Sequence, residues 1–253
     1  MFALLLALAQ QGTAAPPTLE QARLAACMTE ARTDPAQAVT TASGWLEGLS
    51  GAAVSAPQQC LGFAYMGLLR WDAAMLAFQT ARDARPADDR LGRARLGSMA
   101  GNAALQAGQP LVAEGAFATA LDDALAGSDA PLAGLAAADR ARALVALDDA
   151  PAAVTALARA RELAPQEAEV WLLSATLARR TGDLTNAAGW IATARALAPQ
   201  DGAVGLEAGL IAAMAGDDAA ARTAWNAVIS LNVPQSAAAR QYLAQLEQAP
   251  ATP

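Results

Sequence analysis

The chain has 253 residues, of which 55% are apolar and only 4% aromatic, and it carries a formal charge of −7. Such an acidic chain lacks the clustered Lys and Arg that neutralise nucleic-acid phosphates, so no nucleic-acid partner is expected. It contains no histidine and two cysteines. This removes the commonest general base and leaves too few thiolates for a four-ligand zinc site. Without a Gly-rich phosphate loop or a nucleophile and base in a recognisable pattern, we expect no catalytic site, no metal and no cofactor.

The first residues have the pattern of an export signal. Phe2 to Ala9 are apolar, Gln10 to Ala15 are small or polar, and two prolines follow. The apolar run is far shorter than the ~20 residues of a membrane-spanning helix. Residues 1–15 are therefore predicted to be a signal peptide, cleaved after Ala9 or Ala15, which delivers the protein to the periplasm or elsewhere outside the cytoplasm. Because no Arg or Lys precedes the apolar run, an apolar terminus unrelated to export is the alternative.

Two helices are predicted next, over residues 18–54. Thr18 has the side chain of a helix N-cap, and the first helix is expected to end near Arg32. Asp34 and Pro35 are a typical helix start, and the second helix is expected to end near Leu49. Together they predict a degenerate helical hairpin at the N-terminal end.

From residue 55 to residue 234 the sequence repeats. The clearest copies are 168–200 and 202–234, whose small and large residues recur 34 positions apart. Alanine is the best helix former, so each copy is expected to be a pair of helices. Small residues mark close helix approach, and larger residues four positions after the second small column fill the space between hairpins. The first-helix column is Gly62, Gly101, Ala141, Ala175 and Gly209. The second-helix column is Ala74, Ala113, Ala153, Ala187 and Ala221, followed by Phe78, Phe117, Leu157, Ile191 and Trp225.

Two features depart from a uniform period. The spacing slips around Gly127 to Pro131, whose composition predicts an inserted surface loop. Pro86, Pro165 and Pro199 are expected to end second helices, whereas Leu125 stands where a proline is expected.

One copy, with Leu61-Gly62, Tyr65, Ala74, Phe78, Ala81 and Pro86 in order, resembles the tetratricopeptide-repeat (TPR) family. The resemblance implies an all-α fold, a right-handed α-solenoid of helix hairpins, with five repeats over 55–234. Ser236 is expected to cap a terminal helix over residues 235–248 that covers the last repeat, and 249–253 is expected to be a tail.

Cys27 and Cys60 are 33 residues apart, close to one repeat period, so they are expected on the same rung of successive first helices. In an oxidising compartment they would form a disulfide. Two buried free thiols are the alternative.

The resemblance also implies a concave groove lined by the first helices. In this sequence the predicted partner-binding residues are Phe63, Arg95, Asn102, Gln106, Arg142, Glu169, Thr176 and Arg179. The Arg and Asn side chains suit a carboxylate of a partner, although Ala138 and Asp139 stand where basic or amide groups would be wanted. The alternative is that these arginines are solvated and have no ligand.

The function predicted from these features is a non-catalytic scaffold or adaptor that binds a protein or peptide in the bacterial periplasm or cell envelope. A self-associating oligomerisation module and an enzyme accessory subunit are the alternatives, and the oligomeric state is left open.

Overall fold

The computed structural model describes residues 16–248, and in this range the chain forms α-helices, one short 3₁₀ helix and no strand. The N-terminal helices are α1 (Leu19–Thr33), α2 (Pro35–Leu46), η1 (Gly51–Val54), α3 (Ser55–Gly67), α4 (Trp71–Ala84), α5 (Arg90–Gln106) and α6 (Pro110–Ala126). The others are α7 (Ala130–Ala146), α8 (Ala150–Leu163), α9 (Ala168–Arg180), α10 (Leu184–Leu197), α11 (Gly202–Met214), α12 (Asp218–Leu231) and α13 (Ser236–Gln248). The predicted all-α solenoid is confirmed. The predicted signal peptide and tail lie outside the described residues.

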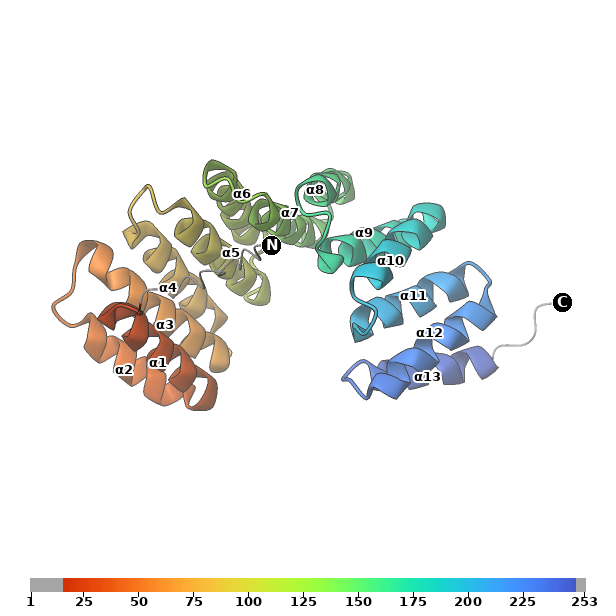
Figure 1. The fold of residues 1–253 in the computed structure, drawn as a ribbon, viewed down its shortest axis with the longest axis horizontal. Coiled ribbons are helices and arrows are strands. Elements are labelled where there is room, and N and C mark those ends of the chain that lie inside the picture. Colours follow the sequence, from red (N-terminus) through yellow and green to blue (C-terminus); the bar gives the residue numbers. More distant parts are fainter. Residues whose placement is uncertain (1–15, 249–253) are drawn as a thin grey trace, which may run out of the picture.

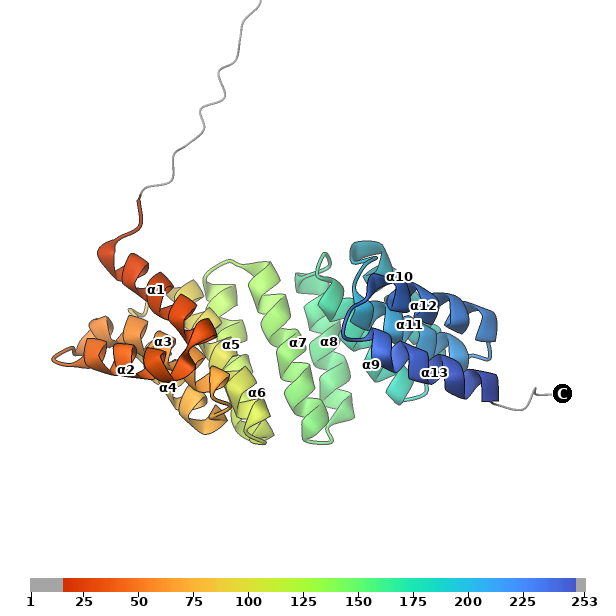
Figure 2. The ribbon, with the colours of Figure 1, turned by 90° about the horizontal axis from the view of Figure 1, so that it is seen from below.

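The helices form a row of hairpins that bends into an arch, with α7 and α8 near its crown (Figure 1). Figure 2 shows the same hairpins following one another along the long axis in chain order. Successive first helices contact each other, as α5 does α7, α7 does α9 and α9 does α11. No comparable contact joins successive second helices among residues 16–248. The first helices therefore line the concave face, and the second helices form the convex face.

A size-matched pair of side chains holds each hairpin together. The small first-helix residue always faces the large second-helix residue sixteen positions later. Glycine faces an aromatic ring in Gly62–Phe78, Gly101–Phe117 and Gly209–Trp225. Alanine shares a core cluster with an aliphatic side chain in Ala141–Leu157 and Ala175–Ile191. A Cβ on Gly101 would lie 2.6 Å from Phe117 Cε1, so the aromatic ring requires glycine there.

Aspartate caps most of the helices. Asp149 and Asp217, which belong to the recurrent Asp-Asp pairs of the sequence, accept hydrogen bonds from the backbone N–H groups of Ala152 and Ala220. The caps predicted at Thr18 and Asp34 are confirmed, and the Thr18 cap is a full capping box with Gln21. These carboxylates satisfy helix ends, which explains them without a catalytic role.

The predicted inserted loop at Gly127 to Pro131 is wrong. α7 begins at Ala130 with Pro131 in its first turn, and only a short turn separates it from α6. The extra residues are absorbed because α5, α6 and α7 each have 17 residues, whereas α8 to α12 have 13 or 14. No proline stops α6, so it continues through Leu125 to Ala126. Pro86, Pro165 and Pro199 each follow a helix end by two residues, as predicted.

Two helix-end predictions are also corrected. α2 ends at Leu46 rather than near Leu49 because Gly48 adopts a positive φ of 75°. Ser236 is the first residue of α13, not its cap. Its hydroxyl donates to the carbonyl of Val228 at 2.8 Å and accepts from the N–H of Val233. Ser236 therefore ties α13 to the end of α12.

Candidate concave-face binding site

The predicted groove residues do not form one cluster. Phe63 packs edge-on against Phe78, with ring centroids 5.3 Å apart, and so contributes to the core. Gln106 lies at the end of α5, beside the turn from Leu69 to Ala73. Arg95 is exposed and lies 4.0 Å from a carboxylate oxygen of Asp129. The structure brings the remaining five residues to the neighbouring faces of α5, α7, α9 and α11.

A polar chain joins α5 to α7. The Asn102 amide donates to Asp139 Oδ2 at 3.2 Å, and Arg142 donates to Asp139 Oδ1 at 2.9 Å and to Asn102 Oδ1 at 3.2 Å. Burial raises the pKa of the Asp139 carboxyl, while the charge and hydrogen bond of Arg142 oppose the shift. Burial and the negative charge of Asp139 also raise the pKa of Glu169. Arg142 is thus largely neutralised within the protein.

An ion pair joins α9 to α11. Arg179 Nε donates to Glu207 Oε1 at 2.6 Å, and Arg179 Nη2 donates to Glu207 Oε2 at 3.3 Å. The two side chains are only 19% and 9% exposed. This bidentate pair occupies Arg179 and limits its availability to a ligand. Glu207 was not among the predicted residues, although it stands 34 positions after Leu173 and 68 after Asp139 in the repeat.

A cleft of about 200 Å³ lies between α7 and α9, with Leu157 of α8 as its floor. Its walls are apolar and its edge carries two arginines and a threonine. The lining residues are Ala138, Ala141, Arg142, Val145, Leu157, Leu173, Thr176, Leu177 and Arg180. Of the predicted groove residues, Arg142 and Thr176 therefore meet at one cleft, and the sequence prediction missed Arg180.

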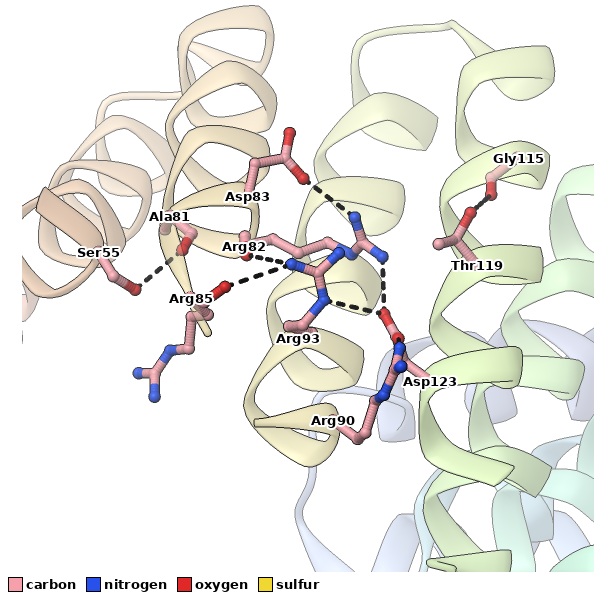
Figure 3. A network of polar contacts seen from close by, with 10 residues as sticks. All are labelled: Ser55, Ala81, Arg82, Asp83, Arg85, Arg90, Arg93, Gly115, Thr119 and Asp123. Atoms are coloured by element: carbon pink, nitrogen blue, oxygen red, sulfur yellow. Dashed lines mark hydrogen bonds and ion pairs between the residues drawn. The ribbon is translucent and has the colours of Figure 1, made fainter. Parts of the chain in front are cut away.

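A second polar cluster ties α4, α5 and α6 together (Figure 3). Asp123, which is only 5% exposed, accepts from Arg82 Nη2 at 2.6 Å and from Arg90 Nη1 at 3.1 Å, with Arg93 Nε at 3.7 Å. Arg93 also donates to the carbonyls of Arg82 and Arg85 at the end of α4. These contacts fasten the extended end of α6 to its neighbours, so the cluster has a structural explanation.

Cys27 of α1 and Cys60 of α3 form a disulfide, with Cα atoms 6.0 Å apart. The expected rung is confirmed, because the bond joins two successive first helices. Between residues 16 and 248 no cluster of three or more metal-binding side chains occurs. No helix in the described part of the chain is long and apolar enough to cross a bilayer.

No family model and no curated protein matches the sequence. Solved structures do match the fold. A structure of PilW, described as a widely conserved type IV pilus biogenesis factor, is 18% identical with a TM-score of 0.66, covering 85% of this chain and 94% of PilW. Pseudomonas aeruginosa PilF is 16% identical with a TM-score of 0.64, covering 89% and 99%. BtubC (BKLC) from P. vanneervenii is 14% identical with a TM-score of 0.60, covering 94% and 96%. At these identities the likeness shows the fold.

Proposed function

Because the chain folds as a tetratricopeptide-repeat solenoid, we propose that it is a non-catalytic scaffold that binds a protein or peptide on its concave face. The observation that carries the proposal is the apolar cleft between α7 and α9, with Arg142, Thr176 and Arg180 at its edge. A concave, largely apolar site with a few polar groups at its edge is typical of ligand recognition.

The concave face is also preorganised. Asn102, Asp139 and Arg142 hold one another, and Arg179 is held by Glu207. A partner would meet side chains that are already fixed, so binding orders few of them and costs less conformational entropy. This arrangement favours an extended peptide or a helix laid across the first helices.

The proposed place of action is the bacterial periplasm or cell envelope. The Cys27–Cys60 disulfide supports export, because disulfides persist in oxidising compartments. The fold likeness to PilW, a pilus biogenesis factor, is consistent with an envelope role.

The binding proposal is tested by capture of crosslinked partners from native cells. Thr176→Arg places a bulky charged side chain at the cleft, and Thr223→Arg makes the same change at an exposed position on α12. We expect a partner recovered with wild type and Thr223→Arg to be lost with Thr176→Arg. Equal recovery with all three proteins would refute binding on the concave face.

The export proposal has its own measurement. Cells are lysed under denaturing conditions with a mass-tagged maleimide, which labels free thiols only. We expect Cys27 and Cys60 to stay unlabelled until a reductant is added. Full labelling without reductant would place the mature chain in a reducing compartment.

A further inference from the structure

Carboxylates bridge two of the junctions between first helices. At the α5–α7 junction Asp139 accepts a hydrogen bond from Asn102. At the α9–α11 junction Glu207 accepts from Arg179. In each case a carboxylate on one first helix meets a donor on the preceding one and occupies the space between them.

The α7–α9 junction lacks this bridge. The equivalent position, 34 residues from both Asp139 and Glu207, is Leu173. Leu173 has no polar side-chain atom to offer, and Arg142 turns back to Asp139 and Asn102. The cleft of about 200 Å³ lies at this junction.

Small residues on α7 keep the cleft open. Ala138 and Val145 line it at the positions where α9, 34 residues later, has Leu172 and Arg179. In the α9–α11 junction Leu172 packs against the core and Arg179 pairs with Glu207. The opening between α7 and α9 thus follows from particular substitutions in the repeat, not from the fold in general.

The edge of the cleft has a defined polarity. Arg180, in the last turn of α9, is exposed and has no carboxylate within ion-pairing distance among residues 16–248. Glu169, in the first turn of α9, lies roughly 16 Å away along the helix axis at 1.5 Å per residue. The carboxylates Asp139 and Glu169 interact with each other, which keeps negative charge toward the Glu169 end. An anionic group is therefore favoured at the Arg180 end.

We propose that this cleft binds one bulky aliphatic or aromatic side chain of the partner, and that Arg180 pairs with a carboxylate next to it. The inference rests on the proposed concave-face binding and deepens it by naming the partner chemistry, an acidic segment with one large apolar anchor. Burial of the anchor supplies affinity, and the carboxylate takes the place of the missing bridge.

Small probes test the pocket without knowledge of the partner. The full-length chain is titrated with 4-methylpentanoate, which combines an isobutyl group with a carboxylate, and binding is followed through the methyl resonances of Val145, Leu157 and Leu177. Acetate and 4-methylpentan-1-ol each retain one half of the probe. We expect saturable shifts at these methyl groups with 4-methylpentanoate and weaker binding of both halves. Absence of saturable shifts at these groups would overturn the inference.

Two variants separate the anchor from the charge. Ala138→Leu fills the cleft with the side chain that α9 carries at the equivalent position, and it should weaken 4-methylpentanoate binding by about tenfold or more. Arg180→Gln changes an exposed residue and should weaken the carboxylate by about threefold while leaving the alcohol unchanged. Ala192→Leu, the same enlargement at an exposed position of α10, is the matched control. Unchanged binding by Ala138→Leu would contradict the assignment of the pocket.

The capture experiment distinguishes this inference from the proposed function. If Ala138→Leu retains a partner that Thr176→Arg loses, concave-face binding stands and the anchor pocket is rejected. If Thr176→Arg also retains the partner, the proposed function itself fails.

Discussion

Inside each hairpin of this chain a small residue of the first helix meets a large residue of the second, and the sizes compensate: glycine with aromatic, alanine with aliphatic. Between hairpins the concave-face contacts change at every step. Phe63 is part of the core on α3, Asn102 and Asp139 bridge α5 to α7, a cleft opens between α7 and α9, and Arg179 pairs with Glu207 beyond it. The regular contacts maintain the fold, and the irregular ones distinguish one part of the concave face from another.

The largest expected effect comes from breaking a pair inside a hairpin. Phe117 is fully buried against Gly101, so Phe117→Ala should lower the free energy of unfolding by about 3–5 kcal/mol. Gly101→Ala should be destabilising because its Cβ meets the ring, and Phe117→Leu should relieve that clash by recreating the Ala–Leu pair of α7 and α8. Urea unfolding of the two single variants and the double variant measures this coupling.

The control for this experiment is Gly115→Ala. A Cβ there meets nothing within 4 Å, so the change should stabilise α6 by about 0.5–1 kcal/mol. Additive effects of Gly101→Ala and Phe117→Leu would show that the two residues are not a matched pair.

The disulfide ranks next because it links hairpins covalently. Its sequence separation of 33 residues corresponds to a loss of about 3–4 kcal/mol on removal in the chain-entropy model. The double change Cys27→Ala and Cys60→Ala should therefore detach α1 first. Faster hydrogen exchange in α1 than in α9 checks this, and unchanged exchange in α1 would contradict it.

The α9–α11 ion pair should give a smaller effect. Arg179→Leu leaves Glu207 nearly buried without its partner and should cost about 2–3 kcal/mol, below the range for fully buried pairs because Arg179 retains some solvent. The double variant Arg179→Leu and Glu207→Leu should recover most of the loss, since it replaces a desolvated pair with apolar packing. A double variant as unstable as the single one would show that the pair itself stabilises this junction.

The smallest effect concerns pH. The pKa of Asp139 in the folded chain is raised above its ordinary value of 3.8 by burial, so the folded state holds this proton more tightly than the unfolded state. The contribution of Asp139 to stability is therefore present at low pH and falls as pH rises from about 4 through the folded pKa. Asp139→Asn should remove this decline, and unfolding curves from pH 3 to pH 7 measure it. A steeper decline in the variant would reverse the sign of the shift.

The fold was predictable because its determinants are local or periodic. Glycine and alanine columns, the large residues that face them and the aspartate caps all recur at fixed spacing. The longer α5, α6 and α7 were not recognised, because a turn added to each of three helices shifts the period in the same way as an inserted loop. Ser236 was taken for a cap because its bond to Val228 joins separate helices.

The binding face was predicted only in outline. Arg142 and Arg179 were expected to meet a ligand, but their carboxylate partners Asp139 and Glu207 come from positions whose proximity only the three-dimensional packing establishes. The cleft follows from what is absent, a carboxylate at Leu173 and a large side chain at Ala138, and aligning the repeats at a 34-residue spacing would have indicated both.

Site-specific photocrosslinking in native cells tests the central claim most directly. A photoreactive amino acid replaces Thr176 at the α7–α9 cleft or, in a matched protein, Thr223 on α12. We predict a discrete protein adduct from position 176, absent from position 223, that diminishes when Ala138→Leu fills the cleft. Adducts from position 223 alone, or none from position 176, would contradict partner binding on the concave face.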